Sequence, residues 1–369
     1  MNLSYWEIKS WLSNIDHIIV GSGIVGLNCA LELKRRFPNS KILVLEKGML
    51  PQGASTKNAG FACFGSMSEI INDLKHHTEV EVFQLVKKRV EGLSVLRNTL
   101  GDQAIGYQQL GGYELYTETN DLYESCYEQK DAINRLLKPL FNEDVFSFQA
   151  DEFGFQNCNK QLGFNRFEGQ IDTGKMMEAL LQKAQGEGIK ILNNVTVQSY
   201  SEKSSSVIVK TNAFDVECSK LFIATNGFAS QQAIAQVKPA RAQVLITNPI
   251  PNLNIKGTFH FDQGYYYFRN IDDRILFGGG RNLDINGEET TDFSQTDLIQ
   301  EALEGYLRST ILPNTSFEIE HRWSGIMGVG EQKKPILEQI GNNVYCGVRL
   351  GGMGVAIGSS VGRDLASLI

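Results

Sequence analysis

The chain has 369 residues, of which 42% are hydrophobic and 21% are charged, and its formal net charge is −7. This length allows a large core and predicts two domains, and the composition is ordinary for a soluble globular protein. A mildly acidic chain without a dominant basic surface is not expected to take nucleic acid or an anionic membrane as its main partner. No apolar run approaches the roughly 18 residues that a membrane helix requires, so no membrane span is expected.

The six cysteines are scattered, with no CxxC pair, and the five histidines show no ligand spacing. This pattern predicts reduced thiols in a cytoplasmic protein, with neither disulfides nor a metal site. The first residues lack a basic region followed by an apolar one, so no secretory signal is predicted. Residues 4–12 are predicted to form a short amphipathic helix with Trp6 and Trp11 as its large apolar residues. We expect this helix to pack on the body, and contact with a partner is the alternative.

A glycine motif with the spacing GxGxxG lies between a predicted strand at residues 17–20 and a predicted helix at residues 24–37. Gly21 allows the tight turn after the strand, Gly23 lets backbone amides approach a pyrophosphate, and Gly26 lets helix and strand pack closely. The N-terminus of the helix offers free N–H groups and a positive dipole end to phosphates.

A second strand is predicted at residues 41–45, and Glu46 stands at its end, twenty residues after Gly26. An acid at this place accepts hydrogen bonds from a pair of ribose hydroxyls and disfavours a 2′-phosphate. Residues 15–47 therefore predict a site for an ADP-containing dinucleotide, and NADP is disfavoured.

The chain after Glu46 does not continue with further strand–helix repeats, as an NAD dehydrogenase would. A polar loop follows at residues 51–60, and its small and hydroxyl side chains suit a surface against phosphate and a flat ring; an ordinary surface loop is the alternative. A second small-residue turn, ATNG at residues 224–227, ends another predicted strand. Ligands collect at such strand ends in open α/β sheets.

The rest of the chain mixes helical and strand periodicity. Helices are predicted at residues 69–100, at 120–137 with Asn120 or Asp121 as the cap, at 174–187, at 292–307 and at the end to about residue 368. Strands are predicted at residues 113–117, 189–192, 195–200, 206–211, 214–218, 220–224, 243–247, 257–261, 264–269, 274–278, 317–323 and 343–347. Residues 146–167 are predicted to be irregular or short-stranded.

Eight segments occur in an order that resembles one family, the FAD-dependent amine oxidoreductases of the D-amino-acid oxidase superfamily. They are VGSGIVGLNCALEL, VLEKG, GASTKNAGF, IDTGKMMEALLQKAQGEGIKI, KLFIATNGFAS, GYYYFRNIDDRILFGGGRN, RWSGIMG and YCGVRLGGMGVAIGSSVGRDLA. The superfamily includes glycine oxidase, sarcosine oxidase and gamma-glutamylputrescine oxidase, and the YYYFRN segment is most similar to the last of these. The segments span nearly the whole chain.

The resemblance implies an α/β fold with an FAD-binding Rossmann-like domain and a second, α+β substrate domain built on a large, mostly antiparallel sheet. The FAD-binding domain is expected to be discontinuous and to comprise residues 1–75, 168–235 and 321–369. Residues 76–167 and 236–320 are then expected to form the substrate domain.

The resemblance also implies where FAD lies. Val197 is expected to meet the adenine through its backbone, the loop at residues 55–61 to lie along the pyrophosphate and flavin, and residues 352–354 to meet the pyrimidine end of the ring. Amides at the start of the last helix would stabilise negative charge on the reduced flavin. The full set of predicted cofactor-binding residues is Gly21, Gly23, Ile24, Val25, Gly26, Glu46, Lys47, Ser55, Thr56, Asn58, Ala59, Gly60, Phe61, Val197, Ala224, Thr225, Asn226, Gly227, Arg349, Gly352, Met353, Gly354 and Val355.

Two departures from the family concern the flavin. Relatives attach it covalently through a cysteine near RWSGIMG or a histidine in the loop matched by residues 55–58, and this chain has neither, with Lys57 in that loop. Noncovalent FAD is therefore expected, with Cys63 and Cys346 as the exceptions to test. Leu276 aligns with the lysine that sarcosine oxidase uses for reaction with oxygen, so the electron acceptor is either oxygen or another molecule.

A substrate carboxylate suits a bidentate guanidinium. The candidates to bind it are Arg269, Arg281, Arg322 and Arg349, each with a structural role as the alternative. Arg349 is favoured because it precedes the glycines expected at the flavin. The predicted substrate-site residues are Arg349, Tyr265, Tyr267 and Arg281, where the tyrosines share one strand face and wall the cavity or else pack in the core. No residue stands out as a general base, and hydride transfer from a neutral amine needs none.

The leading prediction is an FAD-dependent oxidoreductase that oxidises a C–N bond of a small amine or amino acid, with hydride transfer to flavin N5 and hydrolysis of the imine. One alternative is an FAD-dependent dehydrogenase of a 2-hydroxy acid or alcohol that passes electrons to a quinone or carrier, because fold does not fix substrate. A flavin-binding module without catalysis is the other alternative, and an NAD-dependent dehydrogenase is least favoured.

Overall fold

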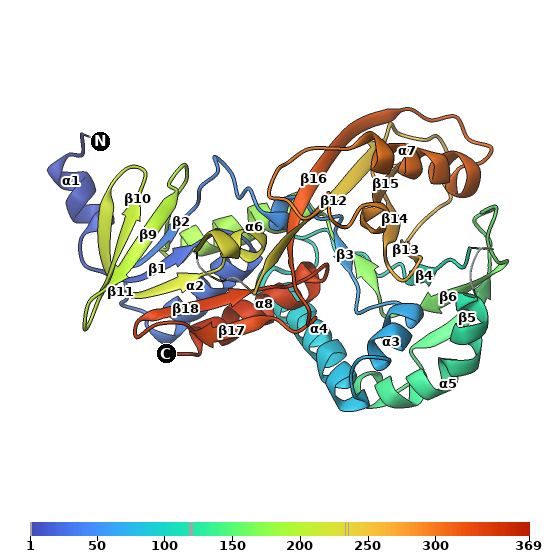
Figure 1. Ribbon diagram of the computed structural model, residues 1–369, viewed down its shortest axis with the longest axis horizontal. Coiled ribbons are helices and arrows are strands. Elements are labelled where there is room, and N and C mark those ends of the chain that lie inside the picture. The colour runs from blue at the N-terminus through green and yellow to red at the C-terminus, as the bar shows by residue number, and fades with distance from the viewer. Residues whose placement is uncertain (1, 118–120, 233, 235) are drawn as a thin grey trace.

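Two eight-stranded sheets occupy the two ends of an elongated molecule, with the helices α2, α4 and α8 between them (Figure 1). The structure is a computed structural model that describes residues 2–117, 121–232, 234 and 236–369. The predicted α/β fold with a second, largely antiparallel sheet is confirmed. Within the described residues, no helix combines the length and the apolar character needed to cross a membrane.

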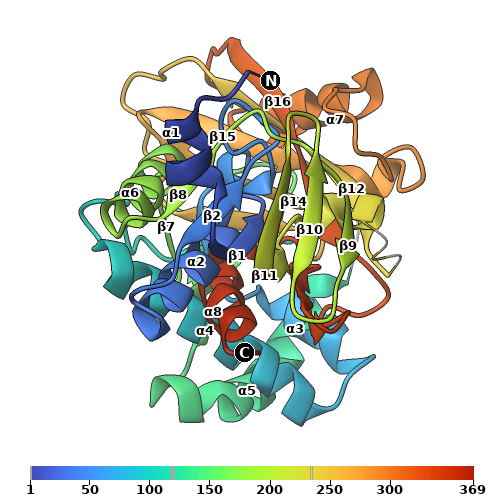
Figure 2. The same ribbon diagram turned by 90° about the vertical axis from the view of Figure 1, so that its left-hand side faces the viewer.

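The first sheet is built around β1 (Ile15–Val20), which pairs in parallel with β2 (Ile42–Leu45) and with β11 (Asp215–Ile223). These strands are runs of Ile, Leu and Val because both faces of a parallel sheet are covered. The other strands of this sheet are β8 (Lys190–Leu192), β9 (Val197–Glu202), β10 (Val207–Thr211), β17 (Ile336–Gln339) and β18 (Val344–Val348). Figure 2 shows β9 and β10 beside β11 at the outer end of the molecule.

Two helices that begin at the inner edge of this sheet, α2 (Ile24–Arg36) and α8 (Gly354–Ala366), pack closely on each other. A Cβ added to Gly362 would lie 2.6 Å from the carbonyl O of Val25, so only glycine fits there. The long helix α4 (Glu79–Leu100) approaches the other side of α8 just as closely at Gly92. The absence of side chains at these glycines is what brings the three helix backbones together.

The second sheet has the order β16-β12-β15-β14-β13-β4-β6-β5, and every neighbouring pair is antiparallel except β13 with β4. Its strands are β4 (Gly112–Glu114), β5 (Phe146–Ala150), β6 (Gln161–Asn165), β12 (Lys238–Thr247), β13 (Thr258–Phe261), β14 (Tyr266–Ile271), β15 (Arg274–Gly279) and β16 (Ile319–Val329). A phenylalanine-rich core fills the face covered by α7 (Asp297–Tyr306), where the rings of Phe259 and Phe268 stack at 4.6 Å. The opposite face is free to line a cavity.

Smaller elements connect the two halves. Strand β3 (Phe61–Ala62) pairs with β7 (Gly169–Gln170) between the sheets. The remaining helices are α3 (Met67–Leu74), α5 (Leu122–Phe141) and α6 (Thr173–Gly186). In Figure 1, α3 and α5 lie below the second sheet.

Several predicted boundaries are wrong. The helix predicted at residues 69–100 is two helices, because Thr78 and Glu81 form a capping box that starts α4 anew. The helix predicted at residues 292–307 begins only at Asp297. The strands predicted at residues 214–218 and 220–224 form the single strand β11, and the strand predicted to end at residue 323 continues to Val329 because it pairs with β12 along its length.

The predicted cap of α5 is settled only in part. Asn120 lies outside the described residues, and Asp121 occupies the N-cap position without a side-chain cap hydrogen bond. The proposed division into domains stays a prediction. Its last boundary, between residues 320 and 321, falls inside β16, whose whole length pairs within the second sheet.

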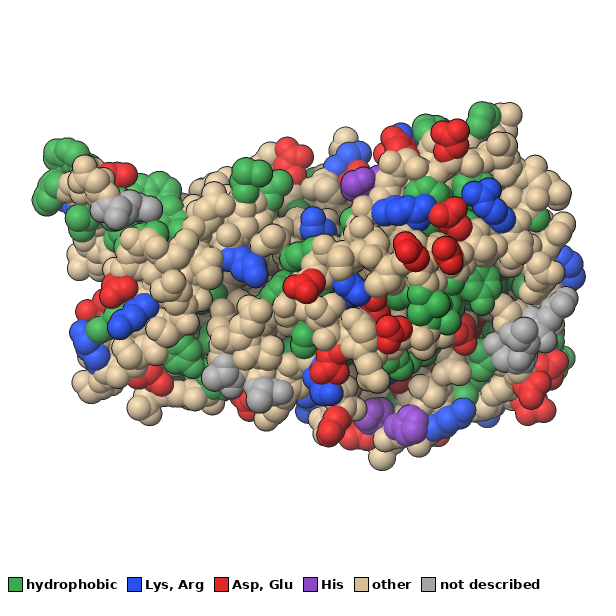
Figure 3. Space-filling view, turned by 45° about the horizontal axis from the view of Figure 1, so that its top comes forward, with side chains coloured by type: hydrophobic (Ala, Val, Ile, Leu, Met, Phe, Trp, Pro, Cys, Tyr) green, Lys and Arg blue, Asp and Glu red, His purple; other side chains and the backbone are tan. Residues whose placement is uncertain are grey.

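The N-terminal segment protrudes, and the expectation that it packs on the body holds only at its end, where Lys190 Nζ lies 4.8 Å from the centre of the Trp11 ring and Leu12 packs against the core of the first sheet. It forms α1 (Tyr5–Glu7) and a π-helical turn at Ile8–Leu12. Trp6 is 68% exposed and Trp11 is 38% exposed. Figure 3 shows hydrophobic side chains gathered on this protruding end.

The close approach of α4 to α8 gives a stability test at Gly92. A Cβ there would lie 2.2 Å from the carbonyl O of Ala356, so Gly92→Ala must push the helices apart. We expect a loss of about 1–3 kcal/mol in the free energy of unfolding, measured by urea denaturation. The matched control is Gly186→Ala at the end of α6, where nothing lies within 4 Å and a gain of about 0.4–1 kcal/mol is expected. Equal stability of the two variants would contradict the described packing.

Candidate active site

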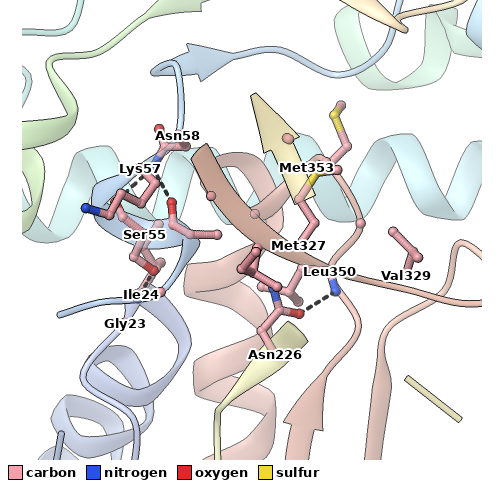
Figure 4. Close-up of a pocket in the computed structure, with 18 of the residues that line it drawn as sticks. Gly23, Ile24, Ser55, Lys57, Asn58, Asn226, Met327, Val329, Leu350 and Met353 are labelled. Carbon is pink, nitrogen blue, oxygen red and sulfur yellow. Dashed lines mark hydrogen bonds between the residues drawn. The ribbon is translucent and has the colours of Figure 1, made fainter. Parts of the chain in front are cut away.

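A cavity of about 590 Å³ lies where the inner edge of the first sheet meets the second sheet. Its walls include the ends of β1, β2 and β11, the first turns of α2 and α8, and the open face of β12 and β14. Its volume lies in the range typical of small-molecule and cofactor sites. Figure 4 shows how residues from distant parts of the chain converge on it.

The glycine motif forms the turn between β1 and α2, as predicted. Gly21 has φ +101°, and a Cβ there would lie 2.9 Å from the carbonyl O of Ala224. At Gly26 a Cβ would lie 1.9 Å from the carbonyl O of Gly21, and at Gly23 it would lie 2.7 Å from Ser55 Oγ. Gly21 and Gly26 are therefore required by close approaches to backbone carbonyls, whereas at Gly23 the near atom is a side-chain hydroxyl that can move.

Two helix N-termini without side-chain caps face this cavity. Neither α2 nor α8 has a side-chain hydrogen bond at its N-cap, whereas α3, α4 and α6 are each capped by a side chain. Residues of the first turn of both helices line the cavity. The N–H of Ile24 donates to Ser55 Oγ at 3.0 Å. Two positive helix ends directed at one cavity suit a ligand that carries phosphate and a second site of negative charge.

Glu46 is buried at the end of β2, and its carboxylate organises the loops around the turn. Its Oε2 accepts hydrogen bonds from Ser22 N at 3.0 Å and Ser22 Oγ at 2.8 Å. Its Oε1 accepts from Gly48 N at 3.0 Å and Gln52 N at 3.3 Å. The carboxylate thus joins the glycine turn to the loop after β2 while it lines the cavity, and its contact with a ribose stays a prediction.

The loop after β2 is held by its own polar side chains and by the second sheet. Asn58 Nδ2 donates to the carbonyl O of Ser55 at 2.8 Å, and Asn58 Oδ1 accepts from Gly60 N at 2.9 Å (Figure 4). From β16, Trp323 Nε1 donates to the carbonyl O of Lys57 at 2.9 Å. These bonds fix the loop backbone as one wall of the cavity.

The turn after β11 meets the segment before α8 at a third wall. Asn226 has φ +44°, and its Oδ1 accepts a hydrogen bond from Leu350 N at 3.1 Å (Figure 4). Arg349 has φ +65°, and its guanidinium donates from Nε and Nη2 to the carbonyl O of Lys334 at 3.0 and 2.8 Å. Arg349 therefore lines the cavity with its guanidinium engaged by the backbone.

Most of the residues predicted to bind the cofactor line this one cavity. The three that do not are Gly26, Thr56 and Gly227. Gly26 and Gly227 pack against backbone carbonyls, and Thr56 Oγ1 donates to the carbonyl O of Pro51 at 2.6 Å. These three residues lie behind the cavity wall, and their contacts fix the backbone of the turns that form it.

Three of the predicted substrate-site residues line the part of the cavity at the second sheet: Tyr265, Tyr267 and Arg281. The ring of Tyr267 lies 5.5 Å from that of Phe61, edge to face, and burial raises the pKa of Tyr267 to about 12, so it is a neutral phenol. Within the part of the chain that the structure describes, no hydrogen bond or ion pair engages the guanidinium of Arg281.

The other two arginine candidates do not line the cavity. Arg269 is buried, and its Nε donates to the carbonyl O of Ala59; burial lowers its pKa to about 10. Arg322 donates to Gln300 and Glu304 on the covered side of the sheet. Both side chains hold loops and helices in place.

The floor of the cavity holds Cys63, which the sequence analysis kept as a possible site of flavin attachment, and three residues that it did not place there: Glu69, Arg89 and His260. Burial acts to raise the pKa of Glu69, but His260, the Ser66 N–H and Arg89 lower it on balance. Burial lowers the pKa of His260, which is therefore a neutral imidazole near pH 7. Since these residues come from a loop, two helices and a strand far apart in the sequence, no spacing could have indicated them.

This combination of a parallel sheet with a glycine turn, a buried acid and two helix N-termini at the cavity is typical of a dinucleotide-binding fold. Residues 16–368 match the family described as FAD dependent oxidoreductase, and the chain belongs to that family. The predicted resemblance, the class of enzyme and FAD as the cofactor are confirmed.

Curated relatives match at low identity. The chain is 24% identical over 235 residues to the bifunctional protein ThiO/ThiG of Synechocystis sp. (strain ATCC 27184 / PCC 6803 / Kazusa), covering 62% of this chain and 32% of that protein. It is 22% identical over 333 residues to the bifunctional protein ThiO/ThiG of Trichormus variabilis, covering 87% of this chain and 47% of that protein. The chain thus spans less than half the length of these relatives.

Solved structures share the fold over nearly the whole chain. L-proline dehydrogenase from P. horikoshii has a TM-score of 0.77 at 19% identity and covers 96% of this chain and 93% of its own. Glycine oxidase from Geobacillus kaustophilus has a TM-score of 0.77 at 19% identity, and the match covers 96% of this chain and 95% of that protein. Iminodiacetate oxidase from Chelativorans sp. BNC1 has a TM-score of 0.74 at 17% identity, and the match covers 95% of this chain and 94% of that protein.

Glu46 provides a test of the cofactor site. Glu46→Ala removes an acceptor that holds the glycine turn and is predicted to bind the ribose, and hydrogen bonds to a charged group contribute about 1.5–3 kcal/mol. We expect FAD affinity to fall by roughly 10- to 150-fold, at about 1.4 kcal/mol per decade, in a fluorescence titration of the apoprotein. Glu338→Ala, at an exposed position of β17, is the control and should bind FAD normally. Unchanged affinity in a folded Glu46→Ala variant would remove Glu46 from the site.

Proposed function

We propose that the chain oxidises a C–N bond of a small amine or amino acid, and that the resulting imine is hydrolysed. The observation that carries this proposal is a single cavity that runs from the glycine turn to a wall of Phe61, Tyr265, Tyr267 and Arg281. A cofactor and a small substrate can therefore lie side by side in it. The names of the structural relatives, glycine oxidase, iminodiacetate oxidase and L-proline dehydrogenase, refer to small amino acids and amines.

The residues of the cavity fit FAD in three places. The backbone of the glycine turn and the start of α2 would hold the pyrophosphate, Glu46 the ribose, and the loop at residues 54–61 with the start of α8 the flavin ring. When bound, FAD supplies the acceptor for the hydride. The start of α8, which has no side-chain hydrogen bond at its N-cap, would provide a positive potential to stabilise negative charge on a bound flavin.

The substrate's carboxylate is assigned to Arg281, because its guanidinium lines the cavity and has no hydrogen bond or ion pair to any residue that the structure describes. Arg349 is placed next to the flavin segment and contributes positive charge, although its donors already bind a carbonyl. Tyr265, Tyr267 and Phe61 exclude water and orient the substrate, and Tyr267 can donate a hydrogen bond as a neutral phenol. A neutral amine needs no base for hydride loss.

A second candidate is oxidation of a 2-hydroxy acid or alcohol. It is favoured by His260, a neutral imidazole that lines the cavity and that could accept a hydroxyl proton.

The electron acceptor is either oxygen or another molecule. Leu276, which is buried, aligns with the lysine that sarcosine oxidase uses for reaction with oxygen, so this chain lacks that lysine.

An anaerobic substrate screen separates these functions. We expect purified, yellow protein to be bleached by a small amine or amino acid and not by hydroxy acids. Arg281→Ala should lower the bleaching efficiency for carboxylate substrates by roughly 10- to 150-fold, because it removes a charge-assisted hydrogen bond of about 1.5–3 kcal/mol. Arg308→Ala, on the exposed turn after α7, is the matched control.

The outcomes of the screen are distinct. Bleaching by hydroxy acids alone would replace the amine proposal with the second candidate. A yellow protein that no substrate reduces would indicate a flavin-binding module without catalysis. Protein that holds no flavin and does not recover it from added FAD would contradict the whole assignment.

We also propose that the flavin is bound noncovalently. The loop at residues 55–58 holds no histidine and residues 324–328 hold no cysteine, and burial raises the pKa of the thiols of Cys63 and Cys346, so neither forms a thiolate readily. Acid precipitation should leave free FAD in the supernatant. A pellet that stays yellow and fluoresces on a denaturing gel would show a covalent bond, and Cys63→Ser and Cys346→Ser would then locate it.

A further inference from the structure

Three side chains of different metal-ligand types meet beneath the floor of the cavity. Cys63 follows β3, Glu168 precedes β7, and His260 lies in β13, so three distant segments bring them together. The Cys63 Sγ, a Glu168 carboxylate oxygen and a His260 ring nitrogen all lie within 4.8 Å of one another. Their exposed fractions are 1%, 2% and 9%.

The contacts of this cluster leave its ligand atoms incompletely paired. Glu168 Oε1 accepts from Phe64 N at 2.8 Å and from Gly65 N at 3.3 Å. Cys63 Sγ makes long contacts, 3.5 Å to Thr258 Oγ1 and 3.8 Å to the carbonyl O of Gly169, and it also interacts with the neighbouring Glu168 carboxylate. His260 Nε2 is buried and has no hydrogen-bond partner among the described residues. A buried polar atom without a partner is costly and calls for an explanation such as an ion.

We propose that Cys63, Glu168 and His260 bind a divalent cation of the Zn²⁺ class. Thiolate, carboxylate and imidazole are the three protein ligand types that Zn²⁺ uses, and the thiol and imidazole exclude Ca²⁺ and Mg²⁺ as the preferred ions. The thiol releases its proton to solvent when the metal binds. A thiolate and a carboxylate then balance the charge of the ion, which suits a buried site.

The geometry requires only small side-chain movements. Bond lengths of about 2.3 Å to sulfur and about 2.0–2.1 Å to nitrogen or oxygen place tetrahedral ligand atoms roughly 3.5 Å apart. The ligand atoms are at most 4.8 Å apart, so they would have to approach one another by up to roughly 1.3 Å to reach that value. The hydrogen bonds from Phe64 N and Gly65 N already fix the carboxylate of Glu168, as the second shell of a metal site does.

Three protein ligands leave a fourth position for water or another small ligand. Cys63 and His260 also line the large cavity, so this position is assigned to the cavity side. Three protein ligands and an exchangeable fourth ligand are typical of catalytic metal sites, in which water or a substrate occupies the fourth position. Nearby, Glu69 and Arg89 carry opposite charges, and both interact with Glu168.

The test is metal binding by the full-length holoprotein, stripped with a chelator and titrated with Zn²⁺ or Co²⁺. We expect one equivalent to bind, and Co²⁺ to give tetrahedral d–d absorption at wavelengths beyond the flavin bands. Cys63→Ser, Glu168→Gln and His260→Gln should each weaken Zn²⁺ binding by about 100-fold or more, the upper end of the effect of losing even an outer-shell partner.

The controls are Cys346→Ser in the first sheet and His321→Gln on β16, which lie outside the cluster and should bind as the unaltered protein does. The FAD content and thermal unfolding of each variant are measured in parallel, so that a folding defect or failure of the flavin assignment is seen separately. If one of the three cluster variants does not fold, Zn²⁺ binding by the other two tests the site. Absence of stoichiometric binding, or equal loss in the controls, would overturn the site.

Discussion

The parallel pairing of β1 with β2 and β11 is the constraint on which the rest of the structure depends. It brings the ends of three strands to one edge, where the chain must turn within a few residues. Gly21 and Gly26 permit that turn because any side chain would collide with backbone carbonyls at 2.9 and 1.9 Å. The glycine turn directs the start of α2 to this edge, and the parallel pairing of β18 with β11 brings the start of α8 there as well, so two helix dipoles meet at one cavity.

The second sheet completes this cavity through bonds to the cofactor loop. Trp323 and Arg269 come from different strands, and both donate to carbonyls of the loop between β2 and β3. The loop therefore depends on both halves of the molecule for its shape. A substitution at Trp323 or Arg269 would therefore alter the backbone of the loop between β2 and β3, which lines the cavity.

The sequence predicted the parts of this arrangement that rest on local chemistry. A glycine spacing, an acid at a strand end and small-residue turns carry their function within a few residues, and nearly all of them line the cavity. Helix and strand ends were less predictable, because a capping box at Thr78 and the partner strand of β16 decide them. Trp6 was expected to pack on the body and is exposed, because the burial of a side chain depends on the whole fold and not on the local sequence.

The floor of the cavity could not be predicted for a different physical reason. Cys63, Glu69, Arg89 and His260 each have an ordinary local setting, and only the pairing of β13 with β4 and the position of α3 and α4 bring them together. Their charges and pKa values follow from mutual burial. The end of the cavity at the glycine turn thus follows from short motifs, whereas its floor follows from tertiary contacts, so the residues of the floor can change while the glycine turn is retained.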